Sequence, residues 1–189
     1  MTHNLLLRAA VLTVSLAVAS RAAAQAFTLT SPDVKPTGVI ADEQVFNGFG
    51  CSGKNVSPAL AWSGAPKGTK SFALLVHDPD APTGGAGWWH WVVVNIPATS
   101  TELKKDAGKA DGTMLPAGAE QITTDFGTPG WGGPCPPPGK PHRYVFALYA
   151  LKVEKLDLAK GATASLAGFM VNANSIGKAT LTGKYGRAK

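Results

Sequence analysis

The sequence predicts a mainly β protein, a sandwich of antiparallel strands with one short helix near the C-terminus. Two observations favour this fold. Short runs rich in Val, Phe, Tyr, Trp and Thr alternate with clusters of turn-forming residues, and the chain holds 22 Gly and 14 Pro. One late segment has the period of a helix, and short strands with a single helix are typical of a decorated sandwich.

The expected elements follow in order along the chain. Six runs are predicted to be strands: 27–30, 71–78, 90–96, 121–126, 143–151 and 179–185. The helix is predicted from apolar residues at helical spacing, namely Leu166, Phe169, Met170, Ala173 and Ile176. We expect Ser165 to cap its start and Gly177 to end it.

The first residues predict a secretory leader that is not part of the fold. Arg8 precedes an uncharged apolar run at 9–19, and residues 22–24 are all Ala. The run is shorter than the roughly 20 apolar residues that span a bilayer. We therefore expect residues 1–24 to be a signal peptide and residues 25–189 to form a single domain. The mature protein is expected to be periplasmic or secreted, without stable membrane insertion.

Charge argues against a nucleic-acid partner. The formal net charge is +6, from 18 Lys and Arg against 12 Asp and Glu. Two of the cations, Arg8 and Arg21, lie in the predicted leader. The others are largely interleaved with acidic residues, and no basic cluster with exposed aromatic partners is recognisable, so no nucleic-acid groove is expected.

The two cysteines, Cys51 and Cys135, predict a disulfide because a leader implies an oxidising destination. Such a bond closes a loop of about 85 residues and contributes roughly 4–5 kcal/mol in the chain-entropy model. Two buried free thiols remain the alternative, because spacing does not show that the two Cα atoms approach closely enough.

Strand alternation places three ionisable side chains together. Asp78 ends one apolar strand face, and His90 and His142 each begin another. If the strand that ends at Asp78 runs antiparallel to both others, these groups meet at one end of the sheet, on its buried side. Alternation also groups His90 with Val92 and Val94. It turns His77 and Arg143 away from the predicted pocket.

Two further segments favour a pocket at this place. Prolines follow Asp78 and Ala81 in the run 78–82, which holds two carboxylates with few conformations to lose. The loop 127–141 is rich in Gly and Pro, and it leads directly into His142. Small residues let backbone N–H groups approach a ligand and form an anion-binding concavity.

Three ordered motifs carry a resemblance to a known family. They are Asp-Pro-Asp-Ala-Pro at 78–82, Trp-His-Trp-Val-Val-Val-Asn at 89–95, and Gly-Gly-Pro-Cys-Pro-Pro-Pro-Gly-Lys-Pro-His-Arg-Tyr at 132–144. The chain resembles the phosphatidylethanolamine-binding proteins over residues 27–185, and within them the bacterial Raf kinase inhibitor-like branch, also called YbhB/YbcL-like.

The resemblance implies a Greek-key β-sandwich of two antiparallel sheets, with a pocket for phosphate-like head groups. Carried over by motif, the implied pocket residues are Asp78, Asp80, His90, Gly132, Gly133, Pro136, His142 and Tyr144. Because bare carboxylates repel phosphate, we expect Asp78 or Asp80 to orient a histidine and favour its imidazolium form. Amides of the glycine loop are expected to complete the site.

The predicted function is therefore a non-catalytic binding protein for a small anionic, phosphate-like ligand, without a cofactor. Two alternatives come from other classes. One is a metal-dependent hydrolase that uses the same Asp/His cluster. The other is a protease or signalling modulator that acts through surface contacts, where Trp88, Trp89 and Trp131 could form an apolar patch. The oligomeric state is open, with a homodimer as one option.

Overall fold

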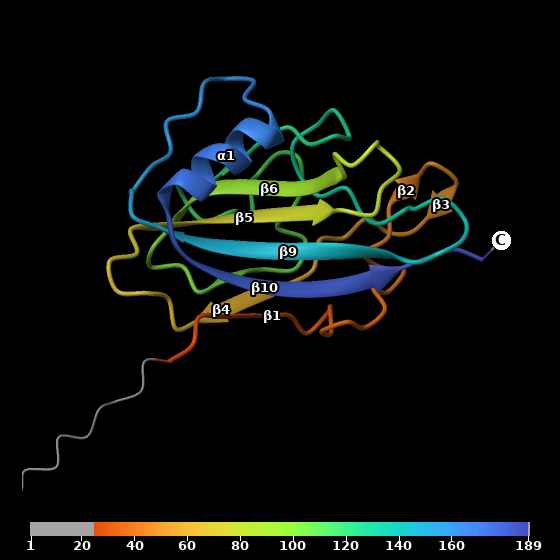
Figure 1. The fold of residues 1–189 in the computed structure, drawn as a ribbon, viewed down its shortest axis with the longest axis horizontal. Coiled ribbons are helices and arrows are strands. Elements are labelled where there is room, and N and C mark those ends of the chain that lie inside the picture. Colours follow the sequence, from red (N-terminus) through yellow and green to blue (C-terminus); the bar gives the residue numbers. More distant parts are fainter. Residues whose placement is uncertain (1–24, 189) are drawn as a thin grey trace, which may run out of the picture.

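The computed structural model describes residues 25–188 and shows two packed β-sheets with one helix (Figure 1). The predicted leader, residues 1–24, lies outside the described residues. Neighbouring strands in each sheet are antiparallel. The mainly β fold with a short C-terminal helix is thereby confirmed.

The larger sheet has five strands in the order β10-β9-β5-β6-β8. Their bounds are Ser175–Tyr185 (β10), His142–Leu151 (β9), Ser71–Asp78 (β5), Trp88–Pro97 (β6) and Glu120–Gln121 (β8). The smaller sheet has the order β1-β4-β7, with bounds Thr28–Thr30, Leu60–Ser63 and Glu102–Leu103. A separate ribbon pairs β2 (Asn47–Gly48) with β3 (Cys51–Ser52).

The central strand β5 separates two apolar layers. Its side chains alternate, so Leu74 and Val76 enter the core between the two sheets, whereas Ala73 and Leu75 face the layer beneath the helix. All four are at most 3% exposed. β5 therefore has no solvent-facing side along most of its length, which agrees with its nearly continuous apolar sequence.

The helix α1 spans Ala164–Asn174 and begins two residues earlier than predicted. Thr163, rather than Ser165, is the N-cap, because its side-chain oxygen accepts a hydrogen bond from the backbone N–H of Leu166 at 3.1 Å. The helix ends at Asn174, with Ser175 rather than Gly177 after its last residue. The chain then turns directly into β10, which begins four residues earlier than predicted.

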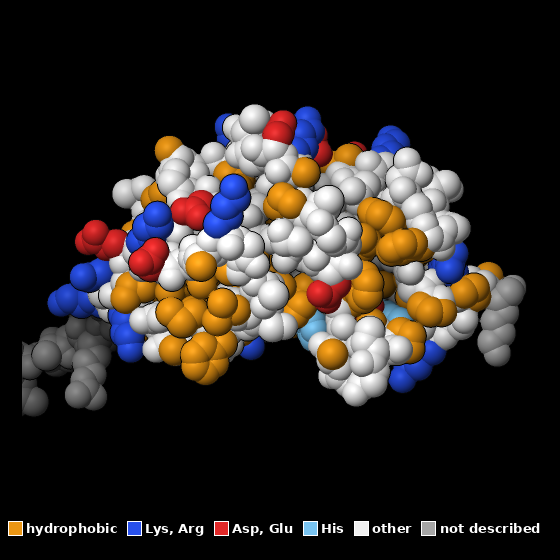
Figure 2. Space-filling view, turned by 90° about the horizontal axis from the view of Figure 1, so that it is seen from above, with side chains coloured by type: hydrophobic (Ala, Val, Ile, Leu, Met, Phe, Trp, Pro, Cys, Tyr) orange, Lys and Arg blue, Asp and Glu red, His pale blue; other side chains and the backbone are white. Residues whose placement is uncertain are grey.

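The apolar stripe that indicated this helix does not face the core. Leu166 and Phe169 are 45% and 69% exposed. The buried face consists of smaller residues: Ala164, Ala167, Gly168 and Val171. A Cβ atom at Gly168 would lie 3.7 Å from the Trp89 ring, so a small residue lets the helix lie close to β6. Figure 2, seen from the side of α1, shows apolar side chains at this surface.

Two other details differ from the predictions. The run 121–126 forms only the short strand β8 and then a turn closed by a hydrogen bond from Gly127 N–H to the Thr124 carbonyl. The short strands β2, β3, β4 and β7 were not predicted. Within residues 25–188, α1 is too short to be a candidate for crossing a membrane.

Candidate functional site

The site lies where one end of β5 meets the first residues of β6 and β9. β5 runs antiparallel to both strands, so Asp78 at its end is brought beside the segments that begin at Trp88 and His142. The proposed strand directions are thus confirmed. The site is built on sheet residues and on the loops that leave this edge.

A β-bulge determines where His90 points. Val76 pairs with Trp91 and His77 pairs with Trp89, so His90 is an extra residue in β6. Trp91 packs between the sheets, whereas Trp89 packs in the layer beneath α1. The expectation that His90 shares a face with Val92 and Val94 is therefore wrong. The bulge interrupts the alternation and turns the imidazole toward Tyr144, with ring centroids 5.0 Å apart.

Asp78 is a buried carboxylate that holds a histidine. Its Oδ2 lies 2.8 Å from Nδ1 of His142, and its Oδ1 accepts a hydrogen bond of 2.8 Å from the backbone N–H of Asp80. Because a carboxylate accepts, His142 carries a proton on Nδ1. Of the two aspartates considered, Asp78 is the one that orients a histidine, and the histidine is His142.

Asp80 does not line the cavity. It forms an ion pair with Arg143, whose Nε and Nη2 donate to the two carboxylate oxygens at 2.8 and 2.7 Å. The backbone N–H of Arg143 donates to Asp80 as well, at 2.9 Å. The hydrogen bonds from Arg143 hold the pKa of the Asp80 carboxyl well below its usual range. Asp80 therefore fastens the 78–82 loop to β9 from outside the pocket.

His90 is a neutral group rather than an imidazolium near neutral pH. Its side chain is buried, and burial lowers its pKa to about 4, although a hydrogen bond to the Gly132 carbonyl acts in the opposite direction. The carbonyl can only accept, so Nδ1 carries the single ring proton and Nε2 has a free lone pair. The expected charged donor cannot be His90.

Tyr144 contributes a donor without a partner. It is fully buried, its ring packs between the sheets, and its hydroxyl makes no hydrogen bond with any of residues 25–188. Burial raises the pKa of this phenol above its usual value, which keeps the proton on the oxygen. An unsatisfied buried hydroxyl is unfavourable unless something else accepts its hydrogen bond.

The glycine loop does not present the amides that were expected. Gly132 donates its N–H to the carbonyl of His90, and Gly133 donates to Asn55 Oδ1 at 2.8 Å. A Cβ at Gly132 would lie 2.3 Å from the Phe126 ring, and one at Gly133 would lie 2.1 Å from the Gln44 carbonyl. Their small size serves close packing of the chain.

These groups surround a cavity of about 210 Å³. Its polar side consists of Asp78, His90, His142 and Tyr144, together with Thr83. Its apolar side is formed by aromatic rings and prolines: Phe49, Trp88, Phe126, Pro82, Pro136 and Pro137. Pro136 and Tyr144 therefore lie at the cavity as predicted, while Asp80, Gly132 and Gly133 do not line it.

Two aromatic rings of this wall were missed from the sequence. Phe49 and Phe126 stack with ring centroids 5.9 Å apart, and Phe49 remains 66% exposed. Phe49 lies two residues before Cys51, so the predicted disulfide could have placed it next to Cys135. Phe126 ends a predicted strand and gave no such signal.

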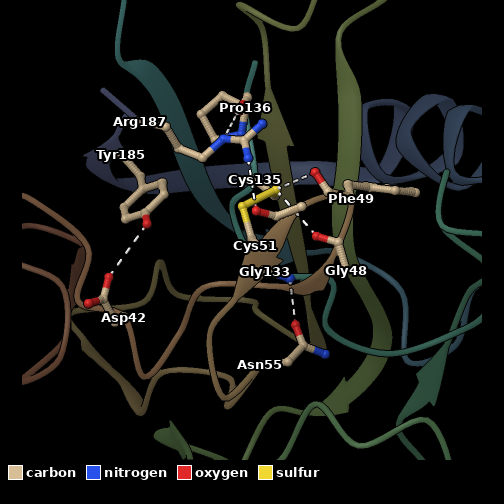
Figure 3. The surroundings of a disulfide bond; sticks show 11 residues. Asp42, Gly48, Phe49, Cys51, Asn55, Gly133, Cys135, Pro136, Tyr185 and Arg187 are labelled. Atoms are coloured by element: carbon tan, nitrogen blue, oxygen red, sulfur yellow. Dashed lines mark hydrogen bonds between the residues drawn. A yellow bond between two sulfur atoms is a disulfide. The ribbon is translucent and has the colours of Figure 1, made fainter. Parts of the chain in front are cut away.

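A disulfide closes one side of the cavity. Cys51 and Cys135 are bonded, with Cα atoms 6.0 Å apart, and Cys135 lines the cavity beside Pro136 (Figure 3). Arg187 braces the same wall: its Nε donates to the Pro136 carbonyl at 2.7 Å and its Nη1 to the Gly50 carbonyl at 3.1 Å. The covalent bond and the guanidinium together fix the turn between β2 and β3 against the proline-rich loop.

The site contains no grouping of metal-ligand side chains. Three or more His, Cys, Asp or Glu side chains positioned for one ion do not occur within residues 25–188. The Asp78–His142 pair and neutral His90 place hydrogen-bonding groups in the lining of the cavity.

Comparison with known proteins identifies the family. A sequence profile described as phosphatidylethanolamine-binding protein matches residues 30–186. The chain belongs to the phosphatidylethanolamine-binding protein family. Similarity to YbcL of Escherichia coli K12 reaches 55% identity over 165 residues, covering 87% of this chain and 90% of YbcL. For YbhB of the same organism the identity is 45% over 157 residues, covering 83% and 98%.

The solved structures agree with this membership. The crystal structure of E. coli YbcL, described as a member of the mammalian PEBP family, superposes with a TM-score of 0.82. The alignment covers 85% of this chain and 98% of that one. A further member of the family, LppC of Mycobacterium tuberculosis H37Rv, is 41% identical over 138 residues, which cover 72% of this chain and 63% of LppC. Its name includes the word lipoprotein.

Proposed function

We propose that this chain is an exported, non-catalytic binding protein that holds the phosphate-like head group of a small anionic ligand. The observation that carries the proposal is the buried hydroxyl of the cavity-lining residue Tyr144, a donor that lacks an acceptor within residues 25–188. An anionic oxygen of a ligand is a strong acceptor for such a donor. The family name, and the lipoprotein name of one relative, support a ligand-binding role and export respectively.

The shape of the cavity supports a ligand with two parts. Polar groups from β5, β6 and β9 share the lining with the aromatic rings of Phe126, Trp88 and Phe49. Concave sites with few polar groups and a largely aromatic lining are typical of small-molecule binding. The head group would contact His142 and Tyr144, and an apolar or aromatic remainder would lie against the rings.

Isothermal titration calorimetry with phenyl phosphate at about pH 6 tests the proposal. Tyr144→Phe is expected to weaken binding about tenfold to a hundredfold, because a hydrogen bond to a charged group contributes roughly 1.5–3 kcal/mol. The same change should not lower the free energy of unfolding, since the hydroxyl makes no protein hydrogen bond.

Tyr149→Phe is the matched control, because Tyr149 faces the layer beneath α1 and lies outside the cavity. It should bind phenyl phosphate like the unmodified protein. Absence of binding to the unmodified protein, or equal affinity of Tyr144→Phe, would show that the cavity does not hold a phosphate-like group through this hydroxyl.

A further inference from the structure

The cavity contains few donors for an anion. Among residues 25–188, no Lys or Arg lines it. Thr83, at the rim, already donates its hydroxyl to the Gly87 carbonyl at 3.0 Å. Within the described residues, the side-chain donors that remain in the lining are the Tyr144 hydroxyl, the Trp88 indole N–H and the His142 ring. The carboxylate of Asp78 adds negative charge on the same side.

His90 adds an acceptor. Its Nδ1–H is directed to the Gly132 carbonyl, so the Nε2 edge of the ring is the one left for a ligand. This nitrogen has no hydrogen-bond partner within the described part of the chain. A fully deprotonated phosphate would place an oxygen lone pair against the lone pair of Nε2.

The surroundings of His90 keep this arrangement near neutral pH. Burial is the largest influence on the ring and disfavours its charged form. Asp78 and Asp125 favour the charged form, and His77 disfavours it. The other neighbours of the imidazole are the uncharged aromatic rings of Phe126, Trp131 and Tyr144. The acceptor at Nε2 therefore persists until the solution is acidic.

We propose that the cavity takes phosphate monoesters as singly charged anions that retain one proton, and that the P–OH group of the ligand donates to Nε2 of His90. This inference rests on the proposed function and specifies its ligand class. The unprotonated oxygens of the same anion accept from Tyr144 and His142. The ligand thus supplies the donor that Nε2 of His90 requires, and the phosphate monoester dianion is disfavoured.

A sulfate monoester provides the matched probe. Phenyl sulfate has nearly the shape and the single charge of the phenyl phosphate monoanion, but it carries no proton on its oxygens in this pH range. The ratio of their affinities therefore isolates the contribution of the ligand's own proton.

Calorimetric titrations of both probes from about pH 5.5 to about pH 8 test the inference. Phenyl phosphate is expected to bind at least about tenfold more tightly than phenyl sulfate at the acidic end, because the sulfate leaves a buried acceptor unpaired. Above the second phosphate pKa of about 6 the ratio should fall, approaching about tenfold per pH unit as the monoanion disappears.

His90→Asn keeps a donor for the Gly132 carbonyl but removes Nε2, so the ratio should move close to one. His77→Asn, on the opposite face of the sheet, should preserve the ratio. A ratio near one in the unmodified protein, a ratio that does not change with pH, or an unchanged ratio in His90→Asn would each overturn the inference. The first two of these outcomes are measured on the unmodified protein and need no variant.

The outcomes also separate this inference from the proposed function. If neither probe binds at any pH, the cavity is not a site for phosphate-like anions, and both proposals are wrong. If both probes bind equally well, the anion site stands and only the selection for a protonated ligand is wrong.

Discussion

At the scale of single residues, the local partner determines what each ionisable group does. Asp78 and Asp80 are two positions apart, yet one is buried against His142 and the other is paired with Arg143 outside the cavity. The two histidines differ in the same way. His142 is held by a carboxylate, whereas His90 is held by a carbonyl and stays neutral.

The buried neutral His90 should make the fold sensitive to acid. Its folded-state pKa of about 4 lies below the unperturbed value of 6.5, so the unfolded chain binds a proton between these pH values and the folded chain does not. Its contribution to stability is present above about pH 6.5 and is lost as the pH falls toward 4. The loss is on the order of 3 kcal/mol.

Urea denaturation at several pH values measures this effect. His90→Asn should show a shallower decline in the free energy of unfolding between about pH 6.5 and about pH 4. His77→Asn should decline as the unmodified protein does. An unchanged pH dependence in His90→Asn would mean that this ring is not the group whose protonation destabilises the fold.

At the scale of elements, β6 and α1 show how an irregular or small residue positions a neighbour. The bulge at His90 lets one strand serve both apolar layers, with Trp89 on one side and Trp91 on the other. Small residues on α1 let the helix lie against β6, so its larger side chains remain outside.

Two substitutions on α1 test which face is buried. Val171 is fully buried, so Val171→Ala should lower the free energy of unfolding by about 2 kcal/mol. Phe169 is mostly exposed, so Phe169→Ala should change it by no more than about 0.5 kcal/mol. Chemical denaturation of both variants gives the answer, and the reverse order would contradict the observed orientation of the helix.

Sequence patterns could predict these elements only in part. Hydrophobic periodicity located α1 and the long strands, and alternation with antiparallel pairing brought Asp78 and His142 together. Periodicity could not reveal the bulge at His90, because an extra residue in a ladder depends on pairing with another strand. It also assigned α1 the wrong buried face, since Ala and Gly carry little hydrophobic signal although they pack closely.

At the scale of the whole molecule, distant segments are fastened around the cavity. The Cys51–Cys135 bond joins positions 84 residues apart, and Arg187 near the end of the described chain braces Pro136. The motifs predicted the pocket but misplaced Asp80 and the glycine amides, whereas the disulfide was predicted from the secretory leader. Motif resemblance indicates which residues are near a site, while hydrogen-bond partners decide which of them remain free for a ligand.

Removal of the disulfide should affect both stability and binding. A Cys51→Ser/Cys135→Ser double variant is expected to lose about 4–5 kcal/mol of the free energy of unfolding, because the unfolded chain regains the entropy of a long loop. Its affinity for phenyl phosphate should also fall, since Cys135 and Pro136 form part of the wall. Urea denaturation and calorimetry test the two effects, and an unchanged unfolding midpoint would contradict the first.

The lack of a lining Lys or Arg has a consequence for the conditions under which a ligand can be captured. Residues 25–188 place no fixed cation in the cavity, and His142 is compensated by Asp78. Any long-range attraction of an anionic ligand therefore comes from cations outside the lining, such as Arg143 and Arg187, and dissolved ions would screen it. Added salt should accordingly slow the arrival of the ligand more than it weakens the hydrogen bonds made inside the cavity.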